Sequence, residues 1–268
     1  MRSACAKNRT SRLRRRTRAT INLDQITAVI LTRNEERNLP RAMASLPAGM
    51  AVLVVDHGST DRTQEIARSR GAHVVQRSFY GFVEARRFAI SHVRTPWTLM
   101  IDADEMLDER LRSAIAETGG HYNGYLLART TFYGDRALRM WRNEPLLRFF
   151  KTGHVRVEPA PAAGGNAQLH ERWDCDPPIG RLEGMLLHYS YPSHAAYREK
   201  YDRYTSIEAL GFEPSRFHVA VETLRAIPRF LWYVTARGAL LDGVTGVRIA
   251  WLSALYPAMV RIKALRNT

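Results

Sequence analysis

The chain of 268 residues has few cysteines and lacks several common functional signatures. Its two cysteines, Cys5 and Cys175, indicate neither a disulfide framework nor a zinc cluster, and they fit a reducing compartment. The first 20 residues contain no apolar core of a secretory signal peptide. No G-x-G-x-x-G follows the first predicted strand and no G-K-[ST] loop is present, which argues against dinucleotide-binding and P-loop proteins.

Acidic residues are scarce at the two ends of the chain. The formal net charge is +14, yet residues 1–20 carry eight Arg or Lys without an acid, and residues 225–268 carry seven against Asp242 alone. Residues 21–224 therefore have no net charge, which argues against a nucleic-acid partner. Basic ends suit an anionic membrane surface, where each Lys or Arg contributes about 1 kcal/mol. We expect residues 1–24 to form a basic, disordered tail.

Short apolar runs alternate with amphipathic stretches through the first half of the chain. Strands are predicted at 27–31, 52–55, 73–75 and 97–101, and helices up to about Leu46, at 62–69 and at 81–92. This alternation predicts an α/β fold with a mostly parallel, doubly wound sheet. The second half is less regular, with strands predicted at 124–129, 146–150 and 185–189 and a helix at 193–210.

The segment from Leu224 onward is unusually apolar but is interrupted by charges. Its longest uncharged run, 249–260, has 12 residues, whereas about 20 are needed to span a bilayer. Trp and Tyr side chains suit the headgroup boundary, which favours interfacial amphipathic helices. A helical hairpin packed on the main domain or on a second subunit is the alternative.

Carboxylates and an amide follow three predicted strands: Asn34 and Glu35, then Asp56, then Asp102 and Asp104. An α/β sheet binds ligands outside the carboxyl ends of its strands. Two hard oxygen ligands at 102 and 104 could hold Mg²⁺ or Mn²⁺, and the ion could hold a diphosphate. The alternative is an acidic cap on the next helix, which is the interpretation we give to Glu105, Asp108 and Glu109. The residues alone do not distinguish a metal site from a helix cap at Asp102 and Asp104.

Several motifs in this order resemble glycosyltransferase family 2, whose members have the GT-A fold. The matching pieces are T-R-N-E at 32–35, V-D-H-G-S-T-D at 55–61, G-F-V-E-A-R-R-F-A at 81–89 and D-A-D at 102–104. The resemblance covers roughly 27–262. Further pieces resemble the bacterial lipopolysaccharide core β-glucosyltransferase branch, namely W-R-N-E-P-L-L-R-F-F at 141–150, L-H-E-R at 169–172, L-L-H-Y-S-Y at 186–191 and L-D-G-V-T-G…L-S-A-L-Y at 241–256.

The resemblance implies roles for the matched positions. A nucleotide-sugar donor, with a UDP-sugar favoured, would be bound by Thr32, Asn34, Glu35, Asp56, Arg86 and Asp102. Asp56 would accept from the base ring N–H, and Arg86 would lie near the donor phosphates, where Arg87 adds a cation of unassigned role. Asp104 would ligate the divalent metal, with Asp102 beside it near the ribose.

Two residues of the second half complete the predicted site. Glu171 is the candidate general base, because the reaction needs a carboxylate within reach of the acceptor hydroxyl. A surface salt bridge with Arg172 is its alternative. His188 is a candidate metal ligand or, equally, a core histidine. His170 is interpreted as structural or as an acceptor contact, and Trp141 as a core residue.

These features together predict a metal-dependent, inverting glycosyltransferase that acts on a cell-envelope glycolipid such as lipopolysaccharide core. It would lie peripherally on the cytoplasmic face of the bacterial inner membrane. The predicted parts are a nucleotide-binding half at 25–118, an acceptor half at 119–222 and membrane-associating helices at 223–268. A polyprenyl-phosphate glycosyltransferase and a non-catalytic sugar-nucleotide-binding protein are the alternatives. Intact Asp102, Asp104 and Glu171 argue against the second of these.

Overall fold

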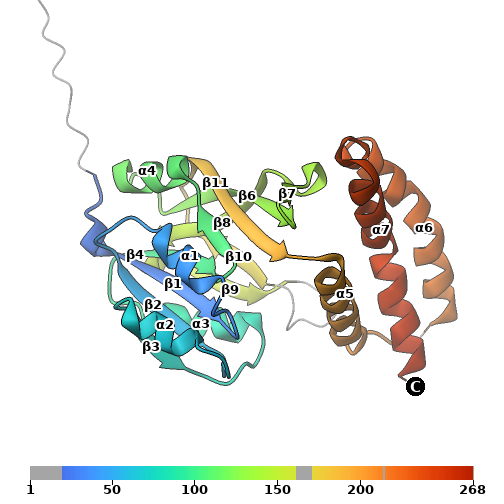
Figure 1. Cartoon of the computed structure of the whole chain (residues 1–268), viewed down its shortest axis with the longest axis horizontal. Coiled ribbons are helices and arrows are strands. Elements are labelled where there is room, and N and C mark those ends of the chain that lie inside the picture. Colours follow the sequence, from blue (N-terminus) through green and yellow to red (C-terminus); the bar gives the residue numbers. More distant parts are fainter. Residues whose placement is uncertain (1–19, 161–170, 214, 268) are drawn as a thin grey trace, which may run out of the picture.

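The computed structural model describes residues 20–160, 171–213 and 215–267. Within them, a nine-stranded mixed sheet forms the centre of the fold. Its strands are β1 (Ile26–Thr32), β2 (Ala51–Asp56), β3 (His73–Gln76), β4 (Trp97–Asp102), β5 (Glu105–Leu107), β6 (Gly124–Tyr133), β7 (Arg136–Ala137), β8 (Glu144–Lys151) and β11 (Ile179–Tyr191). The spatial order is β3-β2-β1-β4-β8-β6-β11-β5, and β7 pairs with β6 (Figure 1).

The first four strands in this order are parallel, as the sequence predicted. Strand β1 pairs with β2 on one side and with β4 on the other, so that Thr32 lies opposite Asp56 and Leu31 lies opposite Asp102. Every residue of β1 is buried, which is expected of a parallel strand covered on both faces. The polar residues that follow these strands therefore meet at one edge of the sheet.

Helices cover the two faces of this parallel half. They are α1 (Leu39–Ala44), α2 (Thr63–Ser69), α3 (Phe82–Ser91) and α4 (Glu109–Glu117). Side chains alternate along a strand, so Ile30 packs in one cluster with α1, α2 and α4, whereas Val29 packs in another with α3. Asp108 caps α4 by accepting from the Leu111 N–H at 2.7 Å, which agrees with its predicted role.

The second half extends the same sheet with mixed directions. Strand β8 is antiparallel to both β4 and β6, β6 is parallel to β11, and β5 is antiparallel to β11. A separate two-stranded antiparallel sheet consists of β9 (Val155–Pro159) and β10 (Glu171–Cys175). The short strand β5, which the sequence analysis did not predict, places Glu105 opposite His188.

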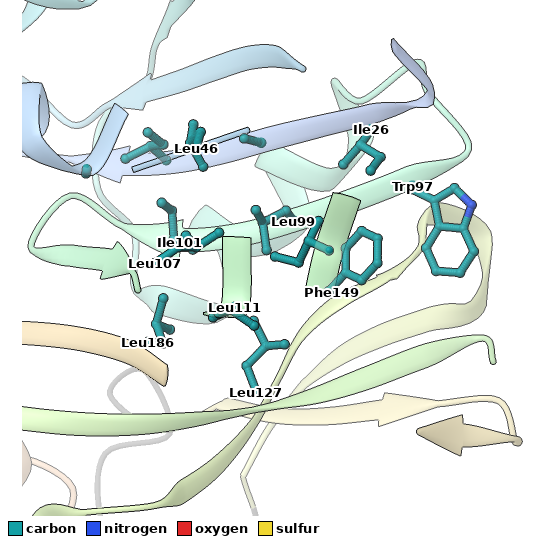
Figure 2. Close-up of a cluster of buried hydrophobic side chains, with 14 of the residues drawn as sticks. Ile26, Leu46, Trp97, Leu99, Ile101, Leu107, Leu111, Leu127, Phe149 and Leu186 are labelled. Carbon is teal, nitrogen blue, oxygen red and sulfur yellow. The ribbon is translucent and has the colours of Figure 1, made fainter. Parts of the chain in front are cut away.

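One apolar cluster joins the two halves. Figure 2 shows Leu99 and Ile101 of β4, Leu127 of β6 and Phe149 of β8 around Leu111 of α4. All five side chains are fully buried. Full burial stabilises each such side chain by about 1.5–3 kcal/mol, so the two halves form one continuous core.

Three long helices end the chain: α5 (His194–Ala209), α6 (Arg216–Val234) and α7 (Gly243–Arg266). In Figure 1, α6 and α7 lie side by side, and α5 lies between them and the sheet. The short helix η4 (Ala239–Asp242) joins α6 to α7. Asp242 accepts from the backbone N–H of Arg139 at 2.7 Å, which fixes the helices to the short helix η2 (Arg139–Trp141). The predicted boundary at residue 222 falls inside α6, so the helical part begins no later than Arg216.

The L-D-G-V-T-G motif has a structural role at this junction. Its Asp242 is the anchoring carboxylate just described, and Gly246 packs directly on the η4 backbone. A Cβ at Gly246 would lie 2.2 Å from the Ala239 carbonyl oxygen, so only glycine fits there. No single helix among the described residues is long and apolar enough to cross a bilayer. The two segments Arg216–Val234 and Ala239–Arg266, bent by 70° relative to each other, reach the required length and composition only when taken together.

Candidate active site

The loops after β1 and β2 are hydrogen-bonded to each other at the carboxyl edge of the sheet. Asn34, with a left-handed φ of 56°, donates its backbone N–H to Ser59 Oγ at 2.9 Å. Its Oδ1 accepts from the Thr60 N–H at 2.8 Å, and the Glu35 N–H donates to Thr63 Oγ1 at 2.8 Å. Asparagine tolerates this backbone conformation better than most residues. Asn34 therefore shapes the loop through both its backbone and its side chain.

Asp56, at the end of β2, is fully buried. Its Oδ2 accepts from the backbone N–H groups of Gly58 at 3.1 Å and Ser59 at 3.0 Å, and from Gln64 Nε2 at 2.9 Å. Its Oδ1 accepts from the hydroxyl groups of Thr32 and Ser59. The predicted residues Thr32 and Asp56 thus lie together, and Asp56 closes the β2–α2 turn. The contact of Asp56 with a nucleobase stays a prediction.

Glu35 interacts electrostatically with the acidic end of β4. Burial raises the pKa of Glu35; a hydrogen bond from Asn38 Nδ2 at 2.8 Å lowers it in part, and the charges of Asp104 and Asp102 raise it further. Burial of like charges in one crevice is costly without a cation, and it is typical of functional sites. The three predicted carboxylates are therefore close enough to interact electrostatically, and we call the region around them the crevice.

Asp102 is held by two buried arginines. Arg86 Nη2 of α3 lies 2.7 Å from Asp102 Oδ1, and Arg148 Nη2 of β8 lies 3.4 Å from Oδ2. Burial alone would raise the pKa of Asp102, but the charges of Arg86 and then Arg148 outweigh it and hold the pKa well below its usual value. The Nη1 atoms of both arginines have no hydrogen-bond partner within the described ranges. Such buried donors cost about 1–3 kcal/mol each unless a ligand satisfies them.

Glu105 does not cap α4, contrary to our interpretation from the sequence. Its side chain is 0% exposed, and its Oε2 accepts from the Asp102 N–H at 3.0 Å. Its Oε1 lies 3.3 Å from Arg129 Nη1 and 3.9 Å from Arg148 Nη2. A buried carboxylate needs such partners. Glu105 thereby fixes the bend between β4 and β5 that orients Asp102 and Asp104.

Asp104 and His188 form the pair of side chains best suited to a metal ion. His188 Nε2 lies 3.3 Å from Asp104 Oδ2, and its Nδ1 lies 3.1 Å from Thr131 Oγ1. The hydroxyl on Nδ1 orients the ring so that Nε2 faces the carboxylate, as an outer partner does for a ligating histidine. Both side chains remain partly exposed, at 17% and 13%.

The Asp104 carboxylate fits Mg²⁺ or Mn²⁺, because such ions use one or two protein carboxylates and take their other ligands from water and substrate phosphates. The described part of the chain contains no cluster of three or more His, Cys, Asp or Glu side chains arranged for a metal. Asp102, predicted as a further ligand, directs its oxygens to Arg86 and Arg148 instead. Its role as a ligand stays a prediction.

Glu171, the candidate base, lies at the start of β10 and is brought to the same crevice. Its Oε1 is 3.4 Å from Arg86 Nε, and its side chain is 16% exposed. The alternative salt bridge with Arg172 is absent from the described residues, since Arg172 Nη2 pairs with Asp174 at 2.8 Å. Arg86 therefore links the carboxylate at the end of β4 to the carboxylate from the second half.

Other residues from the sequence analysis lie elsewhere. Arg87 pairs with Glu84 and with Glu158 and donates to the Val157 carbonyl, so it joins α3 to β9 rather than facing the crevice. Trp141 packs on the rings of Tyr191 and Tyr197, as expected of a core residue. His170 and residues 1–19 lie outside the described residues. The last part of the predicted disordered tail, 20–24, is ordered instead, because Ile21 is buried and its N–H donates to the Thr118 carbonyl at 2.9 Å.

Sequence reasoning missed Glu105 and Arg148. A signal for Arg148 was available, because a single cation interrupts the apolar run 146–150 in a predicted buried strand. An arginine at such a position requires a buried partner. No comparable signal separated Glu105 from the capping acids beside it.

Comparison with known proteins identifies the family. The sequence pattern described as glycosyl transferase family 2 matches residues 27–174, more than half of the chain. The chain therefore belongs to glycosyltransferase family 2, has its GT-A-like fold, and is an enzyme that transfers a sugar from a nucleotide-sugar donor.

Particular relatives are also similar. An uncharacterized glycosyltransferase of Rickettsia typhi is 35% identical over 221 residues, which cover 75% of this chain and 74% of the relative. An uncharacterized glycosyltransferase of Mycobacterium tuberculosis is 40% identical over 85 residues, which cover 32% of this chain and 39% of the relative. Both are described only as uncharacterized glycosyltransferases, so the resemblance to the lipopolysaccharide core branch stays a proposal.

Two solved structures are similar at a more distant level. A fragment of Staphylococcus aureus TarS is 16% identical with a TM-score of 0.43, covering 90% of this chain and 88% of that one. Glucosyl-3-phosphoglycerate synthase from Mycobacterium tuberculosis, solved with Mn²⁺ and UDP-glucose, is 23% identical with a TM-score of 0.30, covering 40% and 43%.

Proposed function

We propose that this enzyme is a metal-dependent, inverting glycosyltransferase that moves a sugar from a UDP-sugar to a cell-envelope glycolipid, such as lipopolysaccharide core. The observation that carries the proposal is the juxtaposition at Arg86. This buried guanidinium pairs with Asp102 on the donor side and with Glu171 from the second half. A carboxylate for the acceptor hydroxyl thus lies beside the residues expected to bind the donor.

Each half of the site has a distinct chemical task. Glu171 would take the proton from the acceptor hydroxyl as that oxygen attacks the anomeric carbon opposite the leaving nucleotide, which inverts the configuration. Asp104 and His188 would hold Mg²⁺ or Mn²⁺, which when bound supplies positive charge to the leaving diphosphate. Asp102, kept ionised by its two arginines, would remain available to a polar group of the donor.

A donor panel tests this proposal. Wild-type protein is heated with Mn²⁺ and a UDP-, GDP-, CMP- or dTDP-sugar, and the unfolding midpoint is measured. At about 100 times Kd, a ligand should raise the midpoint by roughly 5–10 °C, because binding to the folded state alone adds about 2.7 kcal/mol. We expect the largest rise with a UDP-sugar and its loss in EDTA. If no nucleotide sugar raises the midpoint, the proposed donor chemistry is wrong.

The outer surface of the helix pair is the part we propose to contact the membrane. Leu224 and Leu231 are seven apart on one face of α6, and Val244 and Trp251 are seven apart on α7; all four are exposed, Val244 at 86%. Leu240 and Leu241 extend this apolar surface at the turn between the helices, and Phe217 and Ile227 extend it along α6. Isolated exposed apolar residues are ordinary, but eight of them on two adjacent helices and the turn between them are typical of a docking site.

The chemistry around this surface favours anionic lipid as the occupant. Trp232 is exposed, and the Arg237 guanidinium lies 5.6 Å from its ring centre. An aromatic ring beside a cation suits the headgroup boundary. Arg216, Arg225 and Arg248 are exposed on the same helices. Because nucleotide sugars and a lipid acceptor must meet at one surface, we place the enzyme peripherally at the cytoplasmic face of the inner membrane.

Substitution at the turn tests this placement. The double change Leu241→Glu and Val244→Glu should weaken sedimentation with phosphatidylglycerol-containing vesicles by at least about tenfold, since apolar burial in lipid is lost and like charge is added. Ile179→Glu, an exposed apolar position at the start of β11, serves as the control and should sediment normally. Unchanged sedimentation of the double variant contradicts the proposal. A dimer that the same variant dissociates would assign the surface to a second copy.

A further inference from the structure

Lys200 of α5 is held beside the crevice by contacts that the predicted site does not use. Its Nζ donates to Ser190 Oγ at 2.6 Å, and Ser190 follows His188 by two residues. Nζ also lies 5.2 Å from the ring centre of Tyr191 and 6.0 Å from that of Tyr204. Lys200 and Tyr204 are four apart on the helix and therefore share one face. The ammonium group thus lies beside the part of β11 that carries His188, the candidate metal ligand.

The rotation of α5 that produces this placement is fixed by packing. Tyr197 is buried in a cluster with Leu138, Met140 and Ile249, and Ser193 caps the helix by accepting from the Ala196 N–H at 3.1 Å. With one face of the helix fixed by Tyr197, the face that carries Lys200 lies toward β11. The charge of Lys200 acts on both Asp104 and Glu35.

Lys200 differs from the other cations of the crevice in its partners. Arg86 and Arg148 pair with Asp102, and Arg129 pairs with Glu105 and Glu144. Lys200, in contrast, forms no ion pair with a carboxylate among the residues that the structure describes. A lysine ammonium with a hydroxyl and two ring faces as its neighbours keeps donors available for an anion.

We propose that Lys200 binds the terminal phosphate of the donor's diphosphate. This inference rests on the proposed nucleotide-sugar donor and names a binding residue for it. The Asp56 end of the crevice is the one expected to receive the base, whereas Lys200 lies at the Asp104 and His188 end. The phosphate farther from the base is therefore the one within its reach. The ammonium group would stabilise the charge that develops as the sugar leaves.

Calorimetric titration of the full-length chain tests the inference without relying on turnover. The probes are the nucleoside diphosphate that wild type binds best among UDP, GDP, CDP and dTDP, and the matching monophosphate, each in EDTA and in Mn²⁺. Lys200→Met keeps an unbranched apolar side chain and removes only the charge. It should weaken diphosphate binding by about tenfold or more in both media, because a charge-assisted hydrogen bond is lost. Monophosphate binding should change by less than about threefold.

Two further variants make the test specific. Arg203 lies on the same helix, with its guanidinium 5.6 Å from the ring centre of Tyr204. Arg203→Met removes this cation and should leave both nucleotide affinities unchanged. Lys200→Arg should recover most of the diphosphate affinity. If Lys200→Met weakens diphosphate and monophosphate binding equally, or weakens neither, the inference is wrong while the proposed function is unaffected. If wild type binds no nucleoside diphosphate, the proposed function and the inference both fail.

Discussion

Asp104→Ala is expected to reduce Mn²⁺-dependent turnover of the nucleotide sugar by more than about 100-fold. Loss of outer partners of a metal typically costs about 10–100-fold, and loss of a ligand should cost more. In the structure Asp104 offers Oδ2 beside His188 Nε2, and no third side chain of the described part completes the cluster. The site therefore has little redundancy. The measurement is the rate of donor hydrolysis as a function of Mn²⁺ concentration.

The isosteric change Asp104→Asn separates charge from shape. It keeps the size of the side chain but removes its charge, so Mn²⁺ affinity measured by titration should fall while the unfolding midpoint in EDTA changes little. Asp24→Asn, at an exposed acid of the short helix η1 (Leu23–Gln25), is the matched control. Normal Mn²⁺ affinity in both Asp104 variants would remove this residue from the metal site.

Glu171→Gln should lower kcat by about 100- to 10,000-fold, the usual contribution of a positioned general base. The amide retains the shape of the side chain but cannot accept the hydroxyl proton. Donor affinity should stay within about threefold of wild type, because a group that acts only in the transition state changes kcat rather than ground-state binding. The measurements are single-turnover kinetics with acceptor and donor binding without it.

Glu158→Gln is the matched control for this prediction. Glu158 lies on β9, in the same small sheet as Glu171, and pairs with Arg87 at 2.8 Å rather than with Arg86. Its loss should leave kcat unchanged. If Glu171→Gln instead weakens donor binding and spares kcat, Glu171 positions Arg86 and the base must be sought elsewhere.

The parallel half of the fold could be predicted because its signals are local. Strand β1 is a run of seven buried residues, and the predicted range 27–31 differs from it by one residue at each end. Similar apolar runs predicted β2 and β4, and the polar residues just after these strands indicated the carboxyl edge of a sheet. The loop residues Asn34 and Asp56 were found for the same reason, although their observed hydrogen bonds shape the loops.

The remaining parts of the site depend on pairings between distant segments. Glu105 became a buried partner of Asp102 only because β8 supplies Arg148 and β6 supplies Arg129. Lys200 reaches the crevice because α5 packs on α7 and on the end of β11. Sequence periodicity reports which face of an element is buried, but it does not report which element covers that face. Contacts of this kind between distant segments could therefore not be predicted from the sequence.

The pairing of β5 with β11 bears on how this enzyme can diversify. Register places Glu105 opposite His188, and a slip of one residue would turn His188 to the other side of the sheet. The three-residue spacing from Asp102 to Glu105 is therefore intolerant of insertions. Only the loops between the elements of this half can change in length freely, because β6 pairs with β11 and carries Thr131, which contacts His188. Under the proposed function, acceptor preference can thus evolve by insertion and deletion in these loops while the strands that carry Arg148 and His188 are kept.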